Sequence, residues 1–167
     1  MTRAGIALGS NVGDRLSHLR AARSLIAAVT GMHPSILASA IYETAPVGCE
    51  PGAENFLNAV IEIGYNADAA ALHRELRTIE ATLGRTPDHP RNAPRTVDLD
   101  LLYFGDVILA TSSLRVPHPR MTDRRFVLQP LADIRAELVL PTQTRSVAEL
   151  LASVADTSPV VRAATQW

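Results

Sequence analysis

Lysine is absent from this sequence, and all 16 basic side chains are arginine. This absence excludes Schiff-base catalysis by lysine, a phosphate-binding Walker lysine and the strand lysine of protein kinases. Cysteine is nearly absent too: Cys49 is the only one, so the chain can form neither an internal disulfide nor a cysteine-rich zinc site. Aromatic residues make up only 4% of the chain and the net charge is −1, which argues against a nucleic-acid-binding surface.

Long hydrophobic runs are also missing. No apolar run reaches the roughly 18 residues that suggest a membrane span, and the apolar segment near the N-terminus is too short for a signal peptide. We therefore expect a soluble, cytoplasmic protein that binds no membrane. The 167 residues, 47% of them hydrophobic, fit one domain with a real core, which we expect at residues 1–155. Residues 156–167 are expected to form a frayed C-terminal tail.

Hydrophobic spacing predicts that strands and helices alternate along the chain. Apolar runs bounded by turn residues indicate strands at 4–8, 36–43, 55–63 and 95–105, with shorter extended pieces at 107–109, 114–116 and 137–141. Spacings of three and four residues indicate helices at 14–29, 68–83 and 147–154, and a short helix that starts near residue 123.

Two acids interrupt the apolar run at residues 95–105. Alternation along a strand puts Asp98 and Asp100 on one side, with Leu99, Leu101 and Tyr103 on the other. Asp is rare in strands, so the pair calls for an explanation beyond folding. Backbones roughly 7 Å apart allow the two carboxylates to hold Mg²⁺ between them. The alternative is a solvated edge strand whose outer face carries two acids.

Three arginines lie just upstream of the acids. Arg85, Arg91 and Arg95 belong to a segment too rich in proline and polar residues to be core. Cations beside a dicarboxylate are what a polyphosphate bridged by a metal ion requires. The segment therefore indicates a binding site for such a phosphate.

Three further features carry both a structural and a functional interpretation. Phe56 and Asn58 share one face of a predicted strand, where an amide beside an aromatic ring suits a flat heterocycle, although a cross-strand polar contact is the alternative. His118 lies between two prolines that fix its backbone, which makes it a candidate site residue, although a lone histidine is more often a surface or core group. His73, Arg77 and Glu80 lie along one side of a predicted helix, which favours a solvated salt-bridge face.

Several of these motifs together resemble the 6-hydroxymethyl-7,8-dihydropterin pyrophosphokinase (HPPK) family of folate synthesis. The resemblance covers about residues 4–141 and rests on the motifs ALGSN (7–11), YETAPVG (42–48), FLN (56–58), RTVDLDLL (95–102), VPHPRM (116–121) and FVL (126–128) with Arg124.

The resemblance implies an α+β fold: a ferredoxin-like sandwich whose antiparallel sheet has four or more strands, with helices packed on one side and extra elements added. It also implies an ATP-dependent diphosphokinase. Such an enzyme transfers diphosphate from ATP to the hydroxymethyl group of 6-hydroxymethyl-7,8-dihydropterin and releases AMP. We expect a monomer, with a dimer as the alternative.

The resemblance assigns roles to residues at matching positions. Asp98 and Asp100 would bind two Mg²⁺ ions, and Arg85, Arg95 and Asp98 would be catalytic. The pterin would contact Thr44, Val47, Phe56, Asn58 and Phe126. The nucleotide would contact Arg77, Glu80, Leu101, Arg115, His118 and Arg124.

A different class of function is a non-catalytic ferredoxin-like domain that binds a nucleotide or a pterin for regulation. Loss of either acid would favour it. Both Asp98 and Asp100 are present, together with Arg85, Arg95 and His118, so the sequence favours the enzyme.

Overall fold

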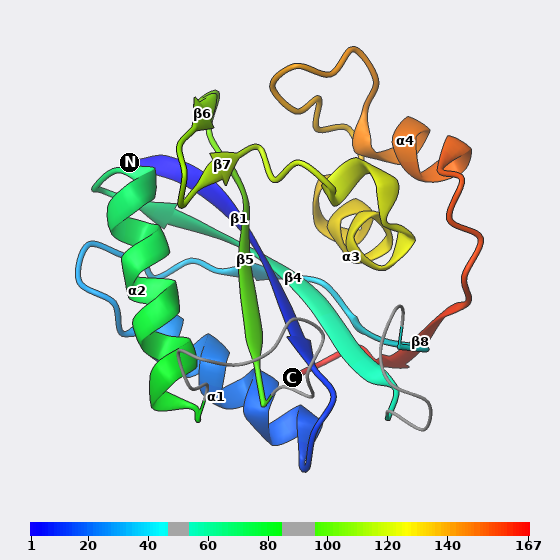
Figure 1. The fold of residues 1–167 in the computed structure, drawn as a ribbon, viewed down its shortest axis with the longest axis horizontal. Helices are drawn as coiled ribbons and strands as arrows, with labels where there is room; N and C mark the ends of the chain where they lie inside the picture. The colour runs from blue at the N-terminus through cyan, green and yellow to red at the C-terminus, as the bar shows by residue number, and fades with distance from the viewer. Residues whose placement is uncertain (47–53, 85–95) are drawn as a thin grey trace.

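The computed structural model describes residues 1–46, 54–84 and 96–167 (Figure 1). The predicted site residues Val47, Arg85 and Arg95 lie outside the described residues. The described elements are, in chain order, β1 (Thr2–Ser10), α1 (Arg15–Ala27), β2 (Leu37–Ala38), β3 (Ile41–Thr44), β4 (Phe56–Tyr65), α2 (Ala69–Thr82), β5 (Asp98–Phe104), β6 (Leu109–Ala110), β7 (Arg115–Val116), a short 3-10 helix (Met121–Asp123), α3 (Arg125–Arg135), α4 (Val147–Ser153) and β8 (Val160–Ala164).

One antiparallel sheet organises the described chain. Its strands lie in the order β5-β1-β4-β3-β8, and β2 pairs with β4 beside β3. If β2 and β3 are taken as one interrupted strand, the first part of the chain runs β-α-β-β-α-β with β1 and β4 in the middle, which is the ferredoxin-like arrangement. The expectation of an α+β, ferredoxin-like fold is therefore confirmed.

Helices lie on both faces of this sheet (Figure 1). The larger core packs α1 and α2 on one face, with Ile6 and Ile61 of the sheet against Leu19 and Leu72 of the helices. The smaller core packs α3 and α4 on the opposite face. The two helices predicted within the β-α-β-β-α-β unit therefore share one face as expected, while the elements that follow it cover the other.

Local signals set the ends of the first two helices. Asp14 caps α1 by accepting a hydrogen bond from the Ser17 amide at 3.1 Å, and Asp68 caps α2 through the Ala71 amide at 2.7 Å. Gly84 follows α2 with a φ of 98°, a conformation that favours glycine. Both predicted helices are confirmed. Their caps depend on residues only a few positions apart, so short sequence patterns can indicate where these helices begin.

The strand predicted at 36–43 is interrupted at Ser39. Its hydroxyl accepts a hydrogen bond from the Val60 amide at 2.9 Å, while its own amide donates to the Val60 carbonyl at 2.9 Å. The adjacent Ala40 amide donates to the carboxylate of Asp133 on α3. Side chains thus replace part of the backbone ladder and separate β2 from β3.

A change of register in β5 reverses the predicted direction of Tyr103. The pairing of β5 with β1 shifts between Gly5 and Ile6, so Leu102 and Tyr103 both join the core on the α3 side. The prediction that Tyr103 shares a face with Leu101 is therefore wrong. The ring lies over Gly5, where a Cβ atom would be 2.1 Å from Tyr103 Cε1, so only glycine leaves it room.

The C-terminal segment is ordered, which corrects the expectation that it frays. β8 pairs with β3 at the edge of the sheet. Beyond β8, Trp167 Nε1 donates to the Ser39 carbonyl at 2.9 Å, and the Arg23 guanidinium lies 5.1 Å from the indole centroid. These contacts join residues more than a hundred positions apart, so local sequence patterns do not reveal them.

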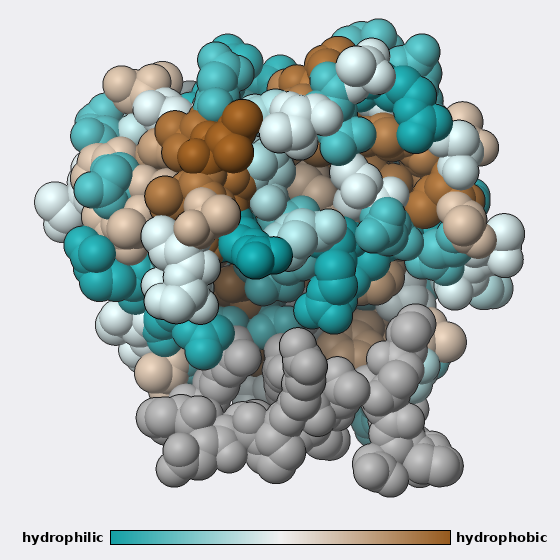
Figure 2. Space-filling model, turned by 45° about the horizontal axis from the view of Figure 1, so that its top comes forward, coloured by the Kyte–Doolittle hydropathy of each residue, from teal (hydrophilic) through white to brown (hydrophobic). Residues whose placement is uncertain are grey.

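Polar side chains cover much of the surface seen in Figure 2. Hydrophobic residues reach it in separate patches on the face shown in Figure 2. Among the residues that the structure describes, no helix has the length and apolar character needed to cross a membrane. The most exposed large apolar side chains are Met1, Leu37, Val107, Ile108, Val139 and Val161, of which only Leu37 and Val161 lie within a named strand.

Candidate active site

Three strands bring the predicted site residues together on the face that carries α3. Gly9 of β1 pairs with Asn58 of β4 on one side and with Asp98 of β5 on the other. Asn58 and Asp98 are therefore two strand spacings apart, about 10 Å, with only a glycine between them. The predicted pterin-binding amide and a predicted metal-binding acid thus face the same side of one sheet.

The two acids occupy half-buried positions at the start of β5, alternating with buried leucines. The amide of Leu99, the residue between them, donates to Glu80 Oε1 at 2.8 Å. Glu80 is fully buried, and its other oxygen lies 2.8 Å from Arg77 Nη1. Glu80 thereby attaches α2 to β5 between the two acids. The expectation of a solvated salt-bridge face is wrong for Glu80.

Arg124 brings a positive charge to this site, and His118 brings an imidazole. Burial lowers the pKa of His118, and the charges of Arg124 and Arg120 lower it further, while Asp100 and Asp98 oppose them. Burial is also the main cause of the lowered pKa of Arg124, again opposed by Asp100 and Asp98. Both groups therefore lie within electrostatic reach of the acids, with His118 neutral at pH 7 and Arg124 still charged.

The backbone holds the His118 segment against β5. The His118 amide donates to the Leu102 carbonyl at 2.7 Å, and the imidazole Nδ1 accepts from the Arg120 amide at 3.2 Å. Further along, the Arg124 guanidinium lies 5.4 Å from the ring centroid of Phe126, at the start of α3. The segment that resembles the family's VPHPRM motif is thus fixed beside the dicarboxylate strand.

The donor set fits a magnesium ion better than a zinc ion. The described residues contain no group of three or more His, Cys, Asp and Glu side chains able to hold a metal. Mg²⁺ is commonly bound by one or two carboxylates, with phosphate and water oxygens completing its shell. Asp98 and Asp100, half-buried on one face of β5, can supply those carboxylates.

A buried hydrogen bond organises the predicted pterin-binding residues. Asn58 Nδ2 donates to Thr44 Oγ1 at 2.7 Å, and both residues are buried. Phe56 is half-buried beside them, because Thr44 pairs with Phe56 across β3 and β4. On the other side of Asn58, its Oδ1 lies 3.2 Å from where a Cβ on Gly9 would be. The site therefore combines an oriented amide, a hydroxyl and an aromatic ring.

Two other predicted nucleotide contacts lie apart from each other, one in the core and one on the surface. Leu101 is buried in the core on the α1 and α2 face, opposite to the acids. Arg115 is exposed on β7, where it pairs with Ala110. Local patterns gave no site role to Gly9 or Arg15. Gly9 lies between Asn58 and Asp98 through strand pairing, and Arg15 of α1 reaches Glu43 of β3.

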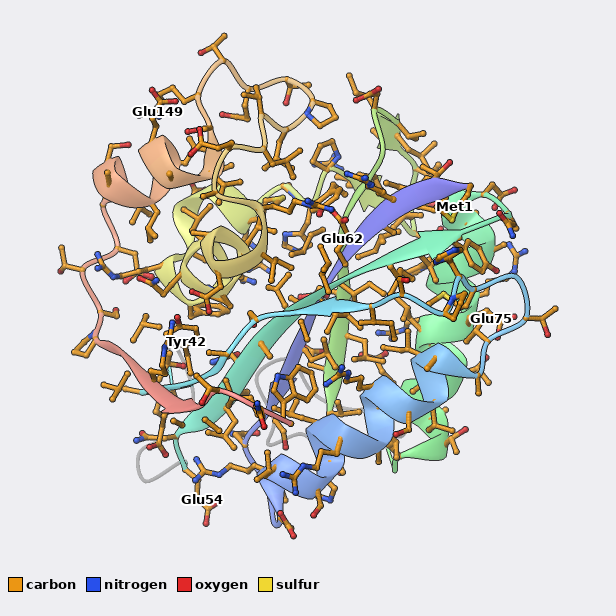
Figure 3. All side chains as sticks on the ribbon, turned by 180° about the vertical axis from the view of Figure 1, so that it is seen from behind. Met1, Tyr42, Glu54, Glu62, Glu75 and Glu149 are labelled. Carbon is orange, nitrogen blue, oxygen red and sulfur yellow. The ribbon has the colours of Figure 1, made fainter. Side chains whose placement is uncertain are left out.

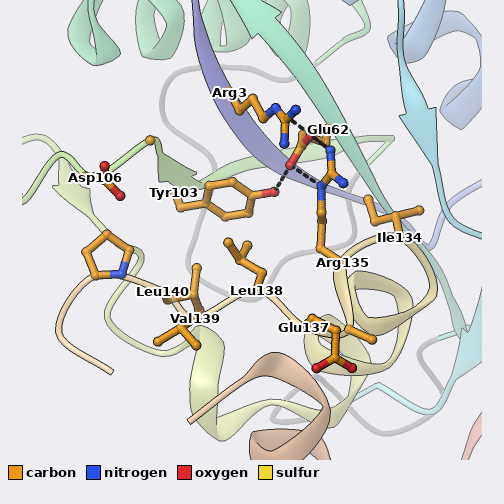
Figure 4. Close-up of a pocket in the computed structure, with 13 residues that line it drawn as sticks. Arg3, Glu62, Tyr103, Asp106, Ile134, Arg135, Glu137, Leu138, Val139 and Leu140 are labelled. Atoms are coloured by element: carbon orange, nitrogen blue, oxygen red, sulfur yellow. Dashed lines mark hydrogen bonds and ion pairs between the residues drawn. The ribbon is translucent and has the colours of Figure 1, made fainter. Parts of the chain in front are cut away.

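A second polar cluster lies on the same face of the sheet, on the α3 side of β4. Arg135 Nε and Tyr103 Oη both donate to Glu62 Oε2, at 2.9 and 2.7 Å, and Arg135 also pairs with Oε1 at 2.5 Å (Figure 4). The cluster borders a pocket of about 510 Å³ that is also lined by Arg3, Asp106 and residues 134–141. Figure 3 shows Glu62 near the middle of the sheet and Tyr42 toward β8.

The fold and the site define an α+β protein of ferredoxin-like topology whose polar residues gather on the α3 side of its sheet. A family model described as 7,8-dihydro-6-hydroxymethylpterin-pyrophosphokinase (HPPK) matches residues 5–136. The chain belongs to this family.

Two bacterial proteins called 2-amino-4-hydroxy-6-hydroxymethyldihydropteridine pyrophosphokinase are similar over most of their length. The protein of Bacillus subtilis is 48% identical over 132 residues, which cover 77% of this chain and 75% of that protein. The protein of Methylorubrum extorquens is 37% identical over 154 residues, which cover 92% and 94%.

Longer proteins match only in part. This chain covers 43% of a solved HPPK-DHPS chain in complex with substrates, with a TM-score of 0.70 over 91% of this chain. At 15% sequence identity that likeness supports the fold alone. The mitochondrial folate synthesis bifunctional protein of Pisum sativum is 41% identical over 131 residues, and the match spans 24% of its length.

Proposed function

We propose that this chain transfers diphosphate from ATP to the hydroxymethyl oxygen of 6-hydroxymethyl-7,8-dihydropterin, in tetrahydrofolate biosynthesis. Family membership and the names of the bacterial relatives support the reaction. The observation that carries it is the pairing of Gly9 with both Asn58 and Asp98, because it puts the amide that we assign to the pterin and the acid that we assign to the metal on one face.

The reaction exchanges one bond to phosphorus for another. The pterin hydroxymethyl oxygen forms a bond to the β-phosphorus of ATP, the bond from that phosphorus to the bridging α,β-oxygen breaks, and AMP leaves with that oxygen. The hydroxyl proton is lost in the process. Asp98 is the carboxylate we assign nearest to the hydroxyl, as a metal ligand and proton acceptor.

Asp98 and Asp100 would hold the magnesium that accompanies ATP, and we propose two ions. When bound, magnesium neutralises phosphate charge and polarises the reacting oxygens. Arg124 adds a permanent positive charge, whereas the neutral imidazole of His118 can offer a hydrogen bond without adding charge. Arg77, Leu101 and Arg115 remain proposed nucleotide contacts, as do Arg85 and Arg95 for the phosphates.

The pterin would lie against Asn58 and Phe56. One Asn58 N–H is already committed to Thr44, so the amide is held in one orientation and keeps a second N–H and a carbonyl oxygen for the ring. Phe126 at the start of α3 and the backbone of Val47 complete the proposed set. The buried bond from Asn58 to Thr44 thus provides an amide already oriented for binding.

We propose a role for Glu80 other than the solvated salt bridge that its position in the helix suggested. Its side chain is fully buried and holds the backbone between Asp98 and Asp100. We propose that it supports the two acids from behind and assists nucleotide binding through Arg77, with which it pairs.

Purified protein mixed with ATP, magnesium chloride and the hydroxymethyldihydropterin tests the function. We expect AMP and the pterin diphosphate in equal amounts, and no AMP when either the pterin or magnesium is left out. If calorimetry shows that both ligands bind but no AMP forms, the chain is the regulatory domain considered as the alternative. Sedimentation of the same sample tests the monomer that the sequence predicts.

A further inference from the structure

Arg15 joins the ends of two strands that carry the proposed pterin-binding residues. It is the first residue of α1, and its Nη1 donates to Glu43 Oε1 at 2.9 Å and to the Asn55 carbonyl at 2.6 Å. Glu43 lies near the end of β3, and Asn55 directly precedes β4. A single guanidinium therefore bridges both strands from the helix side of the sheet.

The residues on either side of these anchors face the site. Thr44 follows Glu43, and Phe56 follows Asn55, and the two are paired across the strands. Because side chains alternate along a strand, Thr44 and Phe56 face the α3 side while Glu43 faces α1. Arg15 thus holds the backbone under the proposed pterin residues without touching their side chains.

The start of α1 holds Arg15 in place for this contact. The Arg15 amide donates to the Gly13 carbonyl at 2.9 Å, and Gly13 has a φ of 63° that favours glycine. Asp14 caps the helix by accepting hydrogen bonds from the amide and hydroxyl of Ser17. The turn between β1 and α1 therefore determines where the guanidinium lies.

The exposure of the pair indicates a role in geometry more than in stability. The side chains of Arg15 and Glu43 are 27% and 38% exposed, so the ion pair alone is worth little to folding. The hydrogen bond to the Asn55 carbonyl adds a restraint on the distance between the ends of β3 and β4, which an isolated ion pair lacks. Groups that position a substrate must be held closely, because a displacement of about 1 Å can be costly to the enzyme.

We propose that Arg15 is a positioning residue for the pterin: by tying Glu43 to Asn55 it fixes the spacing of Thr44, Phe56 and Asn58. This inference rests on the proposed function for its substrate. Arg15 contacts no residue assigned to the nucleotide or to the metal within the described part of the chain, so its effect should be confined to the pterin.

Steady-state kinetics of Arg15→Ala tests this assignment. We expect the KM for the pterin to rise about tenfold, because the groups that receive the ring lose their fixed spacing. The KM for ATP, kcat and the melting temperature should stay close to wild type. Arg20→Ala removes the same charge from an exposed position of the same helix and should leave every parameter unchanged.

Two further variants separate the bridge from a general loss of structure. Arg15→Lys keeps the charge and a donor, and should restore most of the pterin affinity. Glu43→Gln should raise the same KM, and adding it to Arg15→Ala should have little further effect because both break one interaction. A pterin KM that is unchanged in Arg15→Ala, or that rises only in step with the KM for ATP, overturns the proposal.

Hydrogen exchange of the substrate-free protein tests the bridge without any activity. In Arg15→Ala the amides of residues 41–44 and 56–58 should exchange faster, and those of β5 should keep their wild-type rates. Unchanged exchange at the β3 and β4 ends refutes the bridge even if the enzyme is active. An inactive wild type with faster exchange in the variant refutes the proposed function but not the bridge.

Discussion

Two clusters of charged residues lie on the same face of the sheet and differ in how their charges are satisfied. Glu62, which is 5% exposed, receives hydrogen bonds from Tyr103 and Arg135, so both oxygens are paired within the protein. The acids of β5, Asp98 and Asp100, are half-buried instead. Among the described residues, Arg124, in the segment that follows His118, brings positive charge within their electrostatic reach.

The difference separates a structural cluster from a binding site. A buried carboxylate that is fully paired by its own chain stabilises the contact between β4, β5 and α3, and has little left to offer a ligand. Two half-buried carboxylates beside cations retain access to solvent, as a metal-bound phosphate requires. Substitutions at the two clusters should therefore affect different properties: activity at β5 and stability at Glu62.

The largest effect is expected at the dicarboxylate. Asp98→Asn and Asp100→Asn keep the shape of the side chains but remove the charges that would hold magnesium, so AMP formation should fall by at least about a thousandfold. The melting temperature should change little because both side chains are half-buried. Normal turnover in both variants would show that the metal site has been assigned to the wrong residues.

The reverse pattern is expected at Glu62. Glu62→Gln leaves the Arg135 charge without its carboxylate in a partly buried place, which should lower the free energy of unfolding by about 3 kcal/mol. Urea denaturation measures this loss, and turnover per folded molecule should stay within about twofold. Glu75→Gln is the matched control, since Glu75 is exposed on α2 and its loss should change stability by less than about 0.5 kcal/mol.

The pH dependence of stability should follow Glu62 as well. Burial would raise the pKa of Glu62, but hydrogen bonds from Arg135 and Tyr103 and the charges of Arg135 and Arg3 lower it overall. A lowered pKa in the folded state means that the stabilisation is complete above the unfolded value of about 4.3 and is lost as pH falls through the folded value. Unfolding measured from pH 6 to pH 3 should therefore show the gap between wild type and Glu62→Gln shrinking below about pH 4.

Much of the fold followed from local patterns in the sequence. Alternation placed Phe56 and Asn58 on one face of a strand, and the two cores separate Leu57 and Ile61 from Val60 in the same alternating way. The helices predicted at 14–29 and 68–83 begin directly after Asp14 and Asp68, each of which accepts a hydrogen bond from an amide three residues away. What local patterns missed depends on distant partners: Ser39 interrupts a strand by bonding Val60, and the last strand is held by its pairing with β3.

The residues of the site divide in the same way, into those that local patterns revealed and those that depend on partners distant in the sequence. Asp98, Asp100 and Asn58 were visible as polar residues in apolar strands, and the motifs then gave them roles. The burial of Glu80 was hidden, because its partner Leu99 is 19 residues away. Arg15 was missed because its partners Glu43 and Asn55 are 28 and 40 residues away, and no periodicity connects them.

The smallest effect is expected at Tyr103, whose direction the sequence alone mispredicted. Tyr103→Phe keeps the ring over Gly5 and removes one hydrogen bond to Glu62, so the free energy of unfolding should fall by about 1 kcal/mol without loss of turnover. The pKa of Glu62 should rise, because that hydrogen bond helps to lower it.

The same substitution in the Glu62→Gln background decides whether the cluster acts as a unit. With the carboxylate gone, the hydroxyl has lost the charged acceptor that makes its hydrogen bond strong, so Tyr103→Phe should cost less there than in wild type. Equal costs in the two backgrounds would mean that Tyr103 stabilises the fold through its ring alone. In that case the cluster would be an ion pair between Glu62 and the arginines Arg135 and Arg3, with Tyr103 as an aromatic neighbour.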